Sequence, residues 1–171
     1  MSNPLLINAA ELLHRRGSER RVSLQPTVFE LGIDDDRFDP DATVTVSLRL
    51  ESLTDGIVVD GLLSAPWRDL CRRCLSAATG DVVSDVHELY QLAVTDPDAF
   101  EIVADQIDLA TMVRENILLD APLAPLCRSD CAGLCPTCGI DLNTSTCECI
   151  AVVGDPRWAA LSELKAILPD H

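Results

Sequence analysis

The sequence has few aromatic side chains and almost no lysine. Aromatic residues make up 4% of the 171 residues, too few for a platform on which the bases of single-stranded nucleic acid could stack. A single lysine accompanies twelve arginines, and these cations face 28 acidic residues, so the formal net charge is −15. A protein that coats nucleic acid nonspecifically needs many cations against the phosphates. The composition therefore disfavours that class for the chain as a whole.

Long apolar runs and the signatures of common catalytic sites are also missing. The longest apolar runs span a few residues, far below the roughly 20 needed to cross a bilayer, so we expect no membrane association. The first residues lack the basic and apolar regions of a signal peptide, and we expect a cytoplasmic protein. The chain contains no G-x-S-x-G, P-loop, G-x-G-x-x-G or H-E-x-x-H motif, which indicates that it is not an enzyme.

The middle of the chain has the alternation of apolar and polar residues that is typical of half-buried strands. Asp55 and Gly56 form a turn signal between two such segments, and Gly61 is a candidate bulge. Pro66 is expected to end the second strand near a sheet edge. The expected strands cover residues 42–51, 57–63 and 82–90. We therefore predict an α+β fold with an antiparallel β-sheet or partial barrel and a few short helices.

Three segments have features of short helices. In the first, over residues 8–17, Asn8 is a candidate N-cap, and Gly17 ends the pattern. In the second, over residues 108–119, Asp108 is a candidate cap ahead of an apolar face. The third is expected near the C-terminus, where Asp-Pro precedes another apolar stripe.

The few cations are concentrated between residues 14 and 21, where the sequence reads HRRGSERR. A solvated turn is the ordinary interpretation of such a run, and contact with phosphate or with an acidic partner is the alternative. The candidate contact residues are Arg15, Arg16, Arg20 and Arg21. Residues 34–41 are rich in aspartate instead. We interpret them as a solvated loop, because they lack the glycine-bearing EF-hand pattern.

Eight cysteines are the most informative feature of the sequence. Because the cytosol keeps thiols reduced, a disulfide framework is not expected, and metal binding is the leading explanation. Two C-x-x-C pairs, at 71–74 and 135–138, fit tight turns that direct two thiolates at one ion, and zinc favours four such ligands. The eight predict two structural zinc ions, with no open position for a catalytic water. The candidate ligands are Cys71, Cys74, Cys127, Cys131, Cys135, Cys138, Cys147 and Cys149.

The grouping of these ligands is open at this point. A local arrangement joins the last four cysteines and leaves the first four as a second set. It is favoured because it closes the shortest loops. A split ribbon would instead combine the two C-x-x-C pairs, and a third arrangement would mix the sets or leave thiols free.

Two other kinds of chemistry compete with zinc. Iron is the competing metal, because Cys-Pro-x-Cys-Gly also occurs in rubredoxin-type sites, although Cys74 is followed by Leu75 rather than by glycine. A redox dithiol at Cys71 and Cys74 is less favoured, since strands are expected on both sides instead of a helix that begins at the motif.

These features divide the chain into three parts. Residues 1–126 form a β-rich core domain that carries the first C-x-x-C pair. Residues 127–150 form a Cys-rich zinc-binding module, which has too few apolar residues to fold without metal. Residues 151–171 are expected to form a C-terminal helix.

Several segments resemble the YceD family, also called the large ribosomal RNA subunit accumulation protein family. The resemblance covers CRRCL at 71–75, IDL at 107–109, PLAPL at 122–126, CRSDCAGLCPTCGIDLN at 127–143 and DPRWAAL at 155–161. It implies a cytoplasmic bacterial protein that is needed for normal accumulation of large-subunit ribosomal RNA and has no established enzymatic reaction. Some family members keep metal-ligand residues only at the positions of Cys71, Cys74, Cys127 and Cys131, which supports the local arrangement.

The resemblance leads to a prediction of function that composition alone would not give. We predict a noncatalytic ribosome-assembly factor whose acidic surface binds a basic large-subunit ribosomal protein or an early large-subunit particle. The basic stretch is the expected place for any contact with ribosomal RNA. The alternative is a zinc-ribbon regulator that binds nucleic acid.

Overall fold

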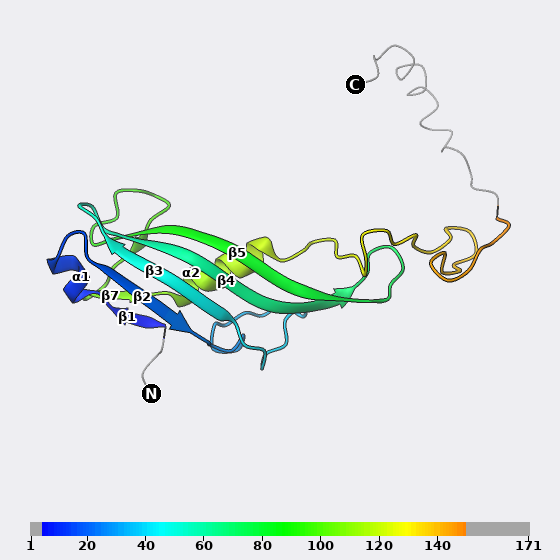
Figure 1. Cartoon of the computed structure of the whole chain (residues 1–171), viewed down its shortest axis with the longest axis horizontal. Coiled ribbons are helices and arrows are strands. Elements are labelled where there is room, and N and C mark those ends of the chain that lie inside the picture. The colour runs from blue at the N-terminus through cyan, green and yellow to red at the C-terminus, as the bar shows by residue number, and fades with distance from the viewer. Residues whose placement is uncertain (1–4, 150–171) are drawn as a thin grey trace, which may run out of the picture.

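A long, curved five-stranded sheet forms the body of the protein (Figure 1). The computed structural model describes residues 5–149, so the expected C-terminal helix lies outside the described residues. The strand order is β2-β3-β4-β5-β6, and every pair is antiparallel except β5 and β6. The strands are β2 (Glu19–Leu24), β3 (Thr45–Ser52), β4 (Ile57–Leu70), β5 (Ala77–Gln91) and β6 (Phe100–Glu101).

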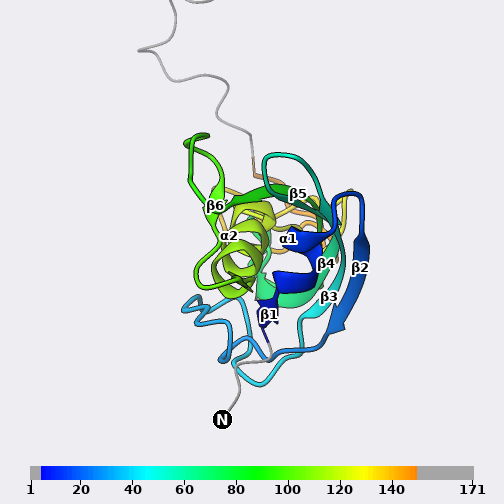
Figure 2. The ribbon, with the colours of Figure 1, turned by 90° about the vertical axis from the view of Figure 1, so that its left-hand side faces the viewer.

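A second, two-stranded sheet and two helices complete the described fold. The small sheet pairs β1 (Leu6–Asn8) with β7 (Gln106–Asp108), and each of its strands leads into a helix, α1 (Ala10–His14) or α2 (Ala110–Asp120). The large sheet curves around these helices (Figure 2). Within residues 5–149, no helix is long and apolar enough to span a bilayer. The predicted α+β class with an antiparallel sheet is confirmed.

The alternation in the sequence places the core on the concave face of the large sheet. In β3, Val46, Leu48 and Leu50 are fully or almost fully buried, while the residues between them face outward. From the other side, α2 contributes Met112 and Ile117, which have no exposed surface. Apolar burial of this kind is the main source of stability for such a layered fold.

The residues that the sequence suggested as N-caps each lie one position before the actual N-cap of the helix, but they still bond to its first turn. Asn8 and Asp108 are the last residues of β1 and β7. Their side-chain oxygens accept hydrogen bonds from the backbone N–H groups of Ala10 and Ala110, at 3.0 and 2.9 Å. Each bond satisfies one of the N–H groups that a helix leaves without an intrahelical partner.

Pro66 does not end β4, which continues to Leu70. Two residues after the proline, Arg68 donates its backbone N–H to Arg37 O at 2.8 Å instead of bonding to the opposite residue of β5. The nitrogen of Pro66 therefore points to the same side as that of Arg68, away from β5. On that side no neighbouring strand needs an N–H donor from residue 66. The predicted end of the strand was wrong because the proline lies on a stretch of β4 that β3 does not reach.

Two further expectations about strands were wrong. The basic stretch is not simply a turn, because β2 begins at Glu19 and takes in Arg20 and Arg21. Gly61 makes no bulge, and it pairs with Leu48 and Val86 in an unbroken register. A Cβ atom on Gly61 would lie 2.1 Å from Ser47 O, so the glycine allows β3 to approach closely.

Candidate metal centres

The eight cysteines lie in two groups of four, and all are free thiols. Within each group, the four Sγ atoms lie within 4.8 Å of one another. The hairpin group is Cys71, Cys74, Cys127 and Cys131. The distal group is Cys135, Cys138, Cys147 and Cys149. This is the grouping of the local arrangement, so the structure does not bring the two C-x-x-C pairs together as a split ribbon would require.

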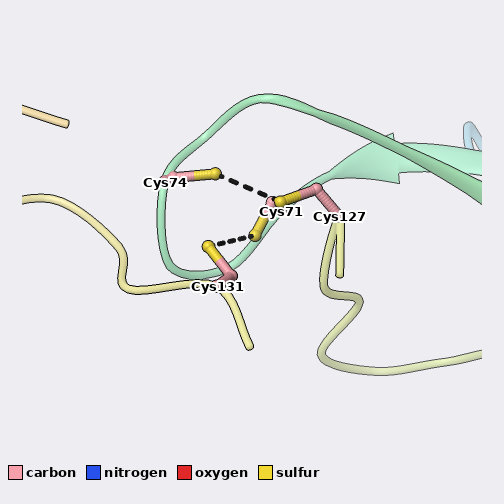
Figure 3. A group of neighbouring side chains, drawn as sticks. All are labelled: Cys71, Cys74, Cys127 and Cys131. Carbon is pink, nitrogen blue, oxygen red and sulfur yellow. Dashed lines mark hydrogen bonds between the residues drawn. The ribbon is translucent and has the colours of Figure 1, made fainter. Parts of the chain in front are cut away.

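The hairpin group closes the end of the longest hairpin (Figure 3). Cys71 and Cys74 lie in the turn between β4 and β5, and Cys127 and Cys131 come from the segment after α2. The sulfurs of Cys74 and Cys127 are 3.5 Å apart, and those of Cys71 and Cys131 are 3.8 Å apart. A tetrahedron of sulfurs around zinc, with Zn–S bonds of about 2.3 Å, has edges of about 3.8 Å. The group therefore fits a tetrahedral thiolate-bound ion.

The turn at Cys71 has the backbone of a metal-binding knuckle. The N–H of Cys71 donates to Ser76 O at 2.7 Å, and the N–H of Leu75 donates to Cys71 O at 2.9 Å. Leu75 has a φ of 61°, in the left-handed region that a leucine seldom adopts. A rubredoxin-type site has glycine at this position, and the structure places Leu75 in the conformation that such a glycine would take.

The turn at Cys135 repeats this geometry in the distal group. The N–H of Cys135 donates to Ile140 O at 2.8 Å, and the N–H of Gly139 donates to Cys135 O at 2.9 Å. Gly139 has a φ of 74°, which costs glycine little. Both C-x-x-C pairs thus form the same loop, so each directs two sulfurs to one side.

The hydrogen bonds around each knuckle favour ionisation of its first sulfur. Burial raises the pKa of Cys71, but backbone N–H groups of Cys127, Cys74 and Arg73 outweigh it and lower the value to about 6. In the distal group, the backbone N–H groups of Cys138 and Thr137 are the main cause that lowers the pKa of Cys135 to about 6. A thiol must lose its proton to bind a metal, so both positions are prepared for that role.

Each group also has a thiol that shares a hydrogen bond within the group and holds its proton more tightly. A hydrogen bond with Cys74, together with burial, raises the pKa of Cys127 to about 12. A hydrogen bond with Cys138, together with partial loss of solvation, raises the pKa of Cys149 to about 12. A cation at the centre of such a group would replace these protons, so metal binding should release protons.

The two groups differ in burial. Cys71, Cys74 and Cys131 are buried beside Ala78, and partly buried Trp67 packs against them. Trp67 also packs against the main core, so the hairpin group extends that core to the end of the hairpin. In the distal group only one of the four cysteines is buried, and Cys138 and Cys149 are exposed.

Asn143 connects the two groups, and it was not singled out from the sequence. It lies in the distal loop, yet its Nδ2 atom is 3.4 Å from Cys131 Sγ in the hairpin group. Its Oδ1 atom accepts from the backbone N–H of Ala132 at 2.8 Å and from Arg128 Nη2 at 2.9 Å. Residues beyond the ligands often orient metal sites in this way.

Arg73 makes a second connection between the turn and the segment after α2. Its Nη1 atom donates to Cys131 O at 2.8 Å, and its own carbonyl accepts from the N–H of Leu134 at 3.0 Å. Gly133 has a φ of 78°, and a Cβ atom there would lie 3.1 Å from the Arg73 carbonyl oxygen. The segment therefore packs tightly against the backbone of the knuckle.

The four arginines of the basic stretch do not form one patch. Arg15, Arg16 and Arg20 line a cavity of about 690 Å³ together with Glu11 and Glu19. Arg21 does not line it and lies at a different pocket, beside Asp60 and Gly61 of β4. The structure thus brings three of the predicted contact residues together and leaves the fourth apart.

The comparison with family models decides the family. A model described as large ribosomal RNA subunit accumulation protein YceD matches residues 59–165, a stretch that contains all eight cysteines. The chain belongs to this family. The family's name suggests a role in the accumulation of the large ribosomal RNA subunit.

Two kinds of relatives are similar to the chain, and only the plant relative carries the family's name in its own. The chain is 33% identical to an uncharacterized protein of Mycobacterium tuberculosis, over 96% of this chain and 83% of that protein. An uncharacterized protein of Mycobacterium leprae is 30% identical over the same share of this chain and 79% of its own length. A chloroplastic YCED homolog 1 from Zea mays, named a large ribosomal RNA subunit accumulation protein, is 41% identical over 29% of this chain and 17% of its own. No solved structure matches.

Proposed function

We propose that this member of the YceD family is a noncatalytic assembly factor of the large ribosomal subunit, acting in the cytoplasm. The observation that carries the proposal is the family match, whose description names accumulation of large-subunit ribosomal RNA. The absence of common catalytic motifs from the sequence agrees with a role in binding rather than in a reaction.

Charge supports a basic protein as the direct partner. The chain has a formal net charge of −15, and two filled four-thiolate sites would each add about −2, because four thiolates outweigh one dication. Complementary charge speeds association and selects partners of the opposite sign. An unassembled basic ribosomal protein, or an early particle that displays one, fits this surface better than bare RNA does.

The proposed metal is zinc, one ion in each cysteine group. The sulfur distances of the hairpin group fit a tetrahedral ion, and four thiolate ligands are typical of structural zinc sites. In the hairpin group, bound zinc would crosslink segments distant in sequence. The cysteines would hold it in closed sites and would serve the fold rather than a reaction.

The basic stretch is the proposed contact with ribosomal RNA inside such a particle. Arg15, Arg16 and Arg20 surround one cavity, and cations grouped in this way suit a phosphate. Because Glu11 and Glu19 line the same cavity, we propose that this contact is subordinate to the protein contact.

Affinity capture from a bacterial lysate at two salt concentrations tests the proposal, with proteins and RNA identified in parallel. The expected result is salt-sensitive capture of a basic large-subunit ribosomal protein or of an early particle, without a shift of bare ribosomal RNA by the purified protein. Salt-sensitive binding to bare RNA or DNA without any ribosomal protein would instead support a zinc-ribbon nucleic-acid-binding regulator.

A further inference from the structure

Most of the outer edge of β5 has no partner strand. On one side β5 pairs with β4 from Ala77 to Tyr90, along almost its whole length. On the other side β6 pairs only with Tyr90 and Gln91, at one end of the strand (Figure 2). Among the residues that the structure describes, no strand pairs with residues 78–89 on that side.

Two hydrogen bonds show which backbone groups point toward this open edge. Gln91 O accepts from Ile102 N at 2.8 Å, beyond β6, so Gln91 turns its backbone polar groups outward. Thr79 lies opposite Arg68 of β4, and Arg68 donates its N–H to Arg37 instead of to Thr79. Because the direction alternates along a strand, the residues that turn N–H and C=O outward are 79, 81, 83, 85, 87 and 89.

Five of these six residues have unpaired outward groups, because Leu89 lies where β6 begins to pair with β5. The backbone N–H and C=O groups of residues 79, 81, 83, 85 and 87 that point outward make no hydrogen bond with another part of the chain between residues 5 and 149. The side chains of the same residues alternate with the buried ones, and Val83 is 62% exposed. An exposed row of unpaired backbone groups is a template for a further strand.

The charge of β5 indicates which kind of added strand would bind to its open edge. The whole strand carries three carboxylates, Asp81, Asp85 and Glu88, and no lysine or arginine. Asp81 and Asp85 are exposed on either side of Val83, on the same face of the sheet. Near the end of the edge, a cavity of about 380 Å³ is lined by residues 87–89 together with Asp55, Asp96 and Asp98.

We propose that the open edge of β5 binds an extended basic segment of a partner protein by β-strand addition. Side chains that face Asp81, Val83 and Asp85 would be basic, aliphatic and basic, so the segment would have the pattern basic-x-aliphatic-x-basic. Backbone hydrogen bonds would supply the affinity for the added strand, and the carboxylates would make binding selective for basic sequences. This inference rests on the proposed function, because it names the surface through which a basic ribosomal protein would bind.

The same charges disfavour a second copy of the chain as the occupant. Antiparallel pairing of two β5 edges centred on Val83 would place Asp81 of each copy against Asp85 of the other. Like charges directly opposite one another in a sheet are destabilising. A basic strand removes this conflict.

A short peptide tests the edge directly. The probe is fluorescein-labelled Gly-Lys-Thr-Val-Thr-Lys-Gly, with capped ends, added to the full-length protein at low salt. Binding should slow hydrogen exchange of the amides of residues 79, 81, 83, 85 and 87 by about tenfold or more, while their even-numbered neighbours, already bonded to β4, stay unchanged. A peptide N-methylated at valine, and one with glutamates in place of the lysines, should not bind.

Two variants separate the backbone from the charges. Val83→Pro removes one outward N–H and leaves the ladder with β4 intact, as Pro66 does on the opposite edge, and should weaken peptide binding about tenfold or more. Asp81→Lys/Asp85→Lys should weaken binding by a similar factor. The matched control is Asp34→Lys/Asp36→Lys, which makes the same change of net charge at two exposed positions of a loop outside the sheet and should alter binding less than about threefold.

Several outcomes would overturn the proposal. Binding without new protection of the odd-numbered amides would place the peptide elsewhere. Protection that grows with protein concentration alone would assign the edge to a second copy. Protection that disappears on deletion of residues 150–171 would assign it to this chain. If a folded Val83→Pro variant captures large-subunit particles at the wild-type level, the edge is rejected as the binding surface and the proposed function stands. If the peptide binds at the edge but no ribosomal component is captured, the edge stands as a binding surface and the proposed function is rejected.

Discussion

Asn143 donates a hydrogen bond to the sulfur of Cys131, with 3.4 Å between Nδ2 and Sγ. The donor belongs to the loop of the distal cysteine group, and the acceptor belongs to the hairpin group. The same side chain accepts a hydrogen bond from the backbone N–H of Ala132, so it helps to fix the position of this sulfur. The two groups therefore share a support, and a change in the distal loop should be felt in the hairpin group.

Asn143→Asp should weaken metal binding by the hairpin group. The substitution removes the N–H donor and places a carboxylate beside a thiolate, and loss of such supporting contacts typically costs metal sites about 10–100-fold in affinity. The measurement is competition with a chromogenic chelator, which should show one of the two metal ions leaving earlier than in the wild type. Thr144→Ala is the control, because its hydroxyl bonds only to the backbone oxygen of Asp141. Equal behaviour of both variants would show that Asn143 does not support the site.

Single cysteine variants should reveal two separate metal sites. The purified protein should contain about two zinc ions per chain, and Cys135→Ser should lose one of them, because a closed site has four thiolate ligands. In this variant residues 135–149 should lose protection from hydrogen exchange, while the strands β3–β5, which have their own apolar core, should keep it. Cys71→Ser should instead release the ion of the hairpin group. Elemental analysis together with hydrogen exchange checks both variants, and iron in place of zinc would change the assignment of the metal.

Local sequence signals predicted the interior of the sheet well and its ends poorly. Alternation placed the buried residues of β3 correctly, because a half-buried strand leaves that pattern in the sequence itself. The prediction that Pro66 ends a strand was wrong. A strand can contain proline where its nitrogen faces no neighbouring strand, and the position of the neighbours is set by the tertiary fold. β2 was missed because its arginines do not show a clear apolar alternation.

The cysteine groups could be predicted further than the contacts that support them. The distal group could be predicted because it closes short loops. The hairpin group, in which Cys71 meets Cys131, then consists of the four cysteines that are left. Leu75 gave no signal, because a leucine with a φ of 61° is stabilised by the hydrogen bonds of the knuckle rather than by its own preference. Asn143 gave none either, since its partner sulfur belongs to the other group.

Gly139→Ala should weaken the distal site through backbone conformation alone. Gly139 has a φ of 74°, and a Cβ atom there would meet no atom within 4 Å, so the substitution adds no clash. The left-handed conformation costs a residue with a Cβ atom about 1–2 kcal/mol, which corresponds to roughly a 5–30-fold loss of metal affinity if the cost falls on the metal-bound state. Zinc titration of the variant measures this loss.

Gly17→Ala is the matched control for that experiment. Gly17 has a φ of 75°, and the space around it is equally open, but it lies between α1 and β2, away from both cysteine groups. Its substitution should lower the free energy of unfolding by a similar amount and leave zinc affinity unchanged. A loss of zinc affinity in Gly17→Ala would mean that general destabilisation, and not the knuckle, explains the effect at Gly139.

Arg15→Ala/Arg16→Ala should reduce capture of particles that contain ribosomal RNA and spare capture of a free basic protein. The two side chains line the cavity beside α1, and removing both takes two cations away from any phosphate bound there. The comparison is Arg21→Ala/Arg68→Ala, which removes the same charge from positions outside that cavity. Capture should be measured below and at physiological ionic strength, where the screening length is roughly 8 Å and long-range attraction is weakened. Equal loss in both double variants would show a general charge effect. Equal loss of RNA particles and free protein in the first variant alone would show that the stretch belongs to the protein interface.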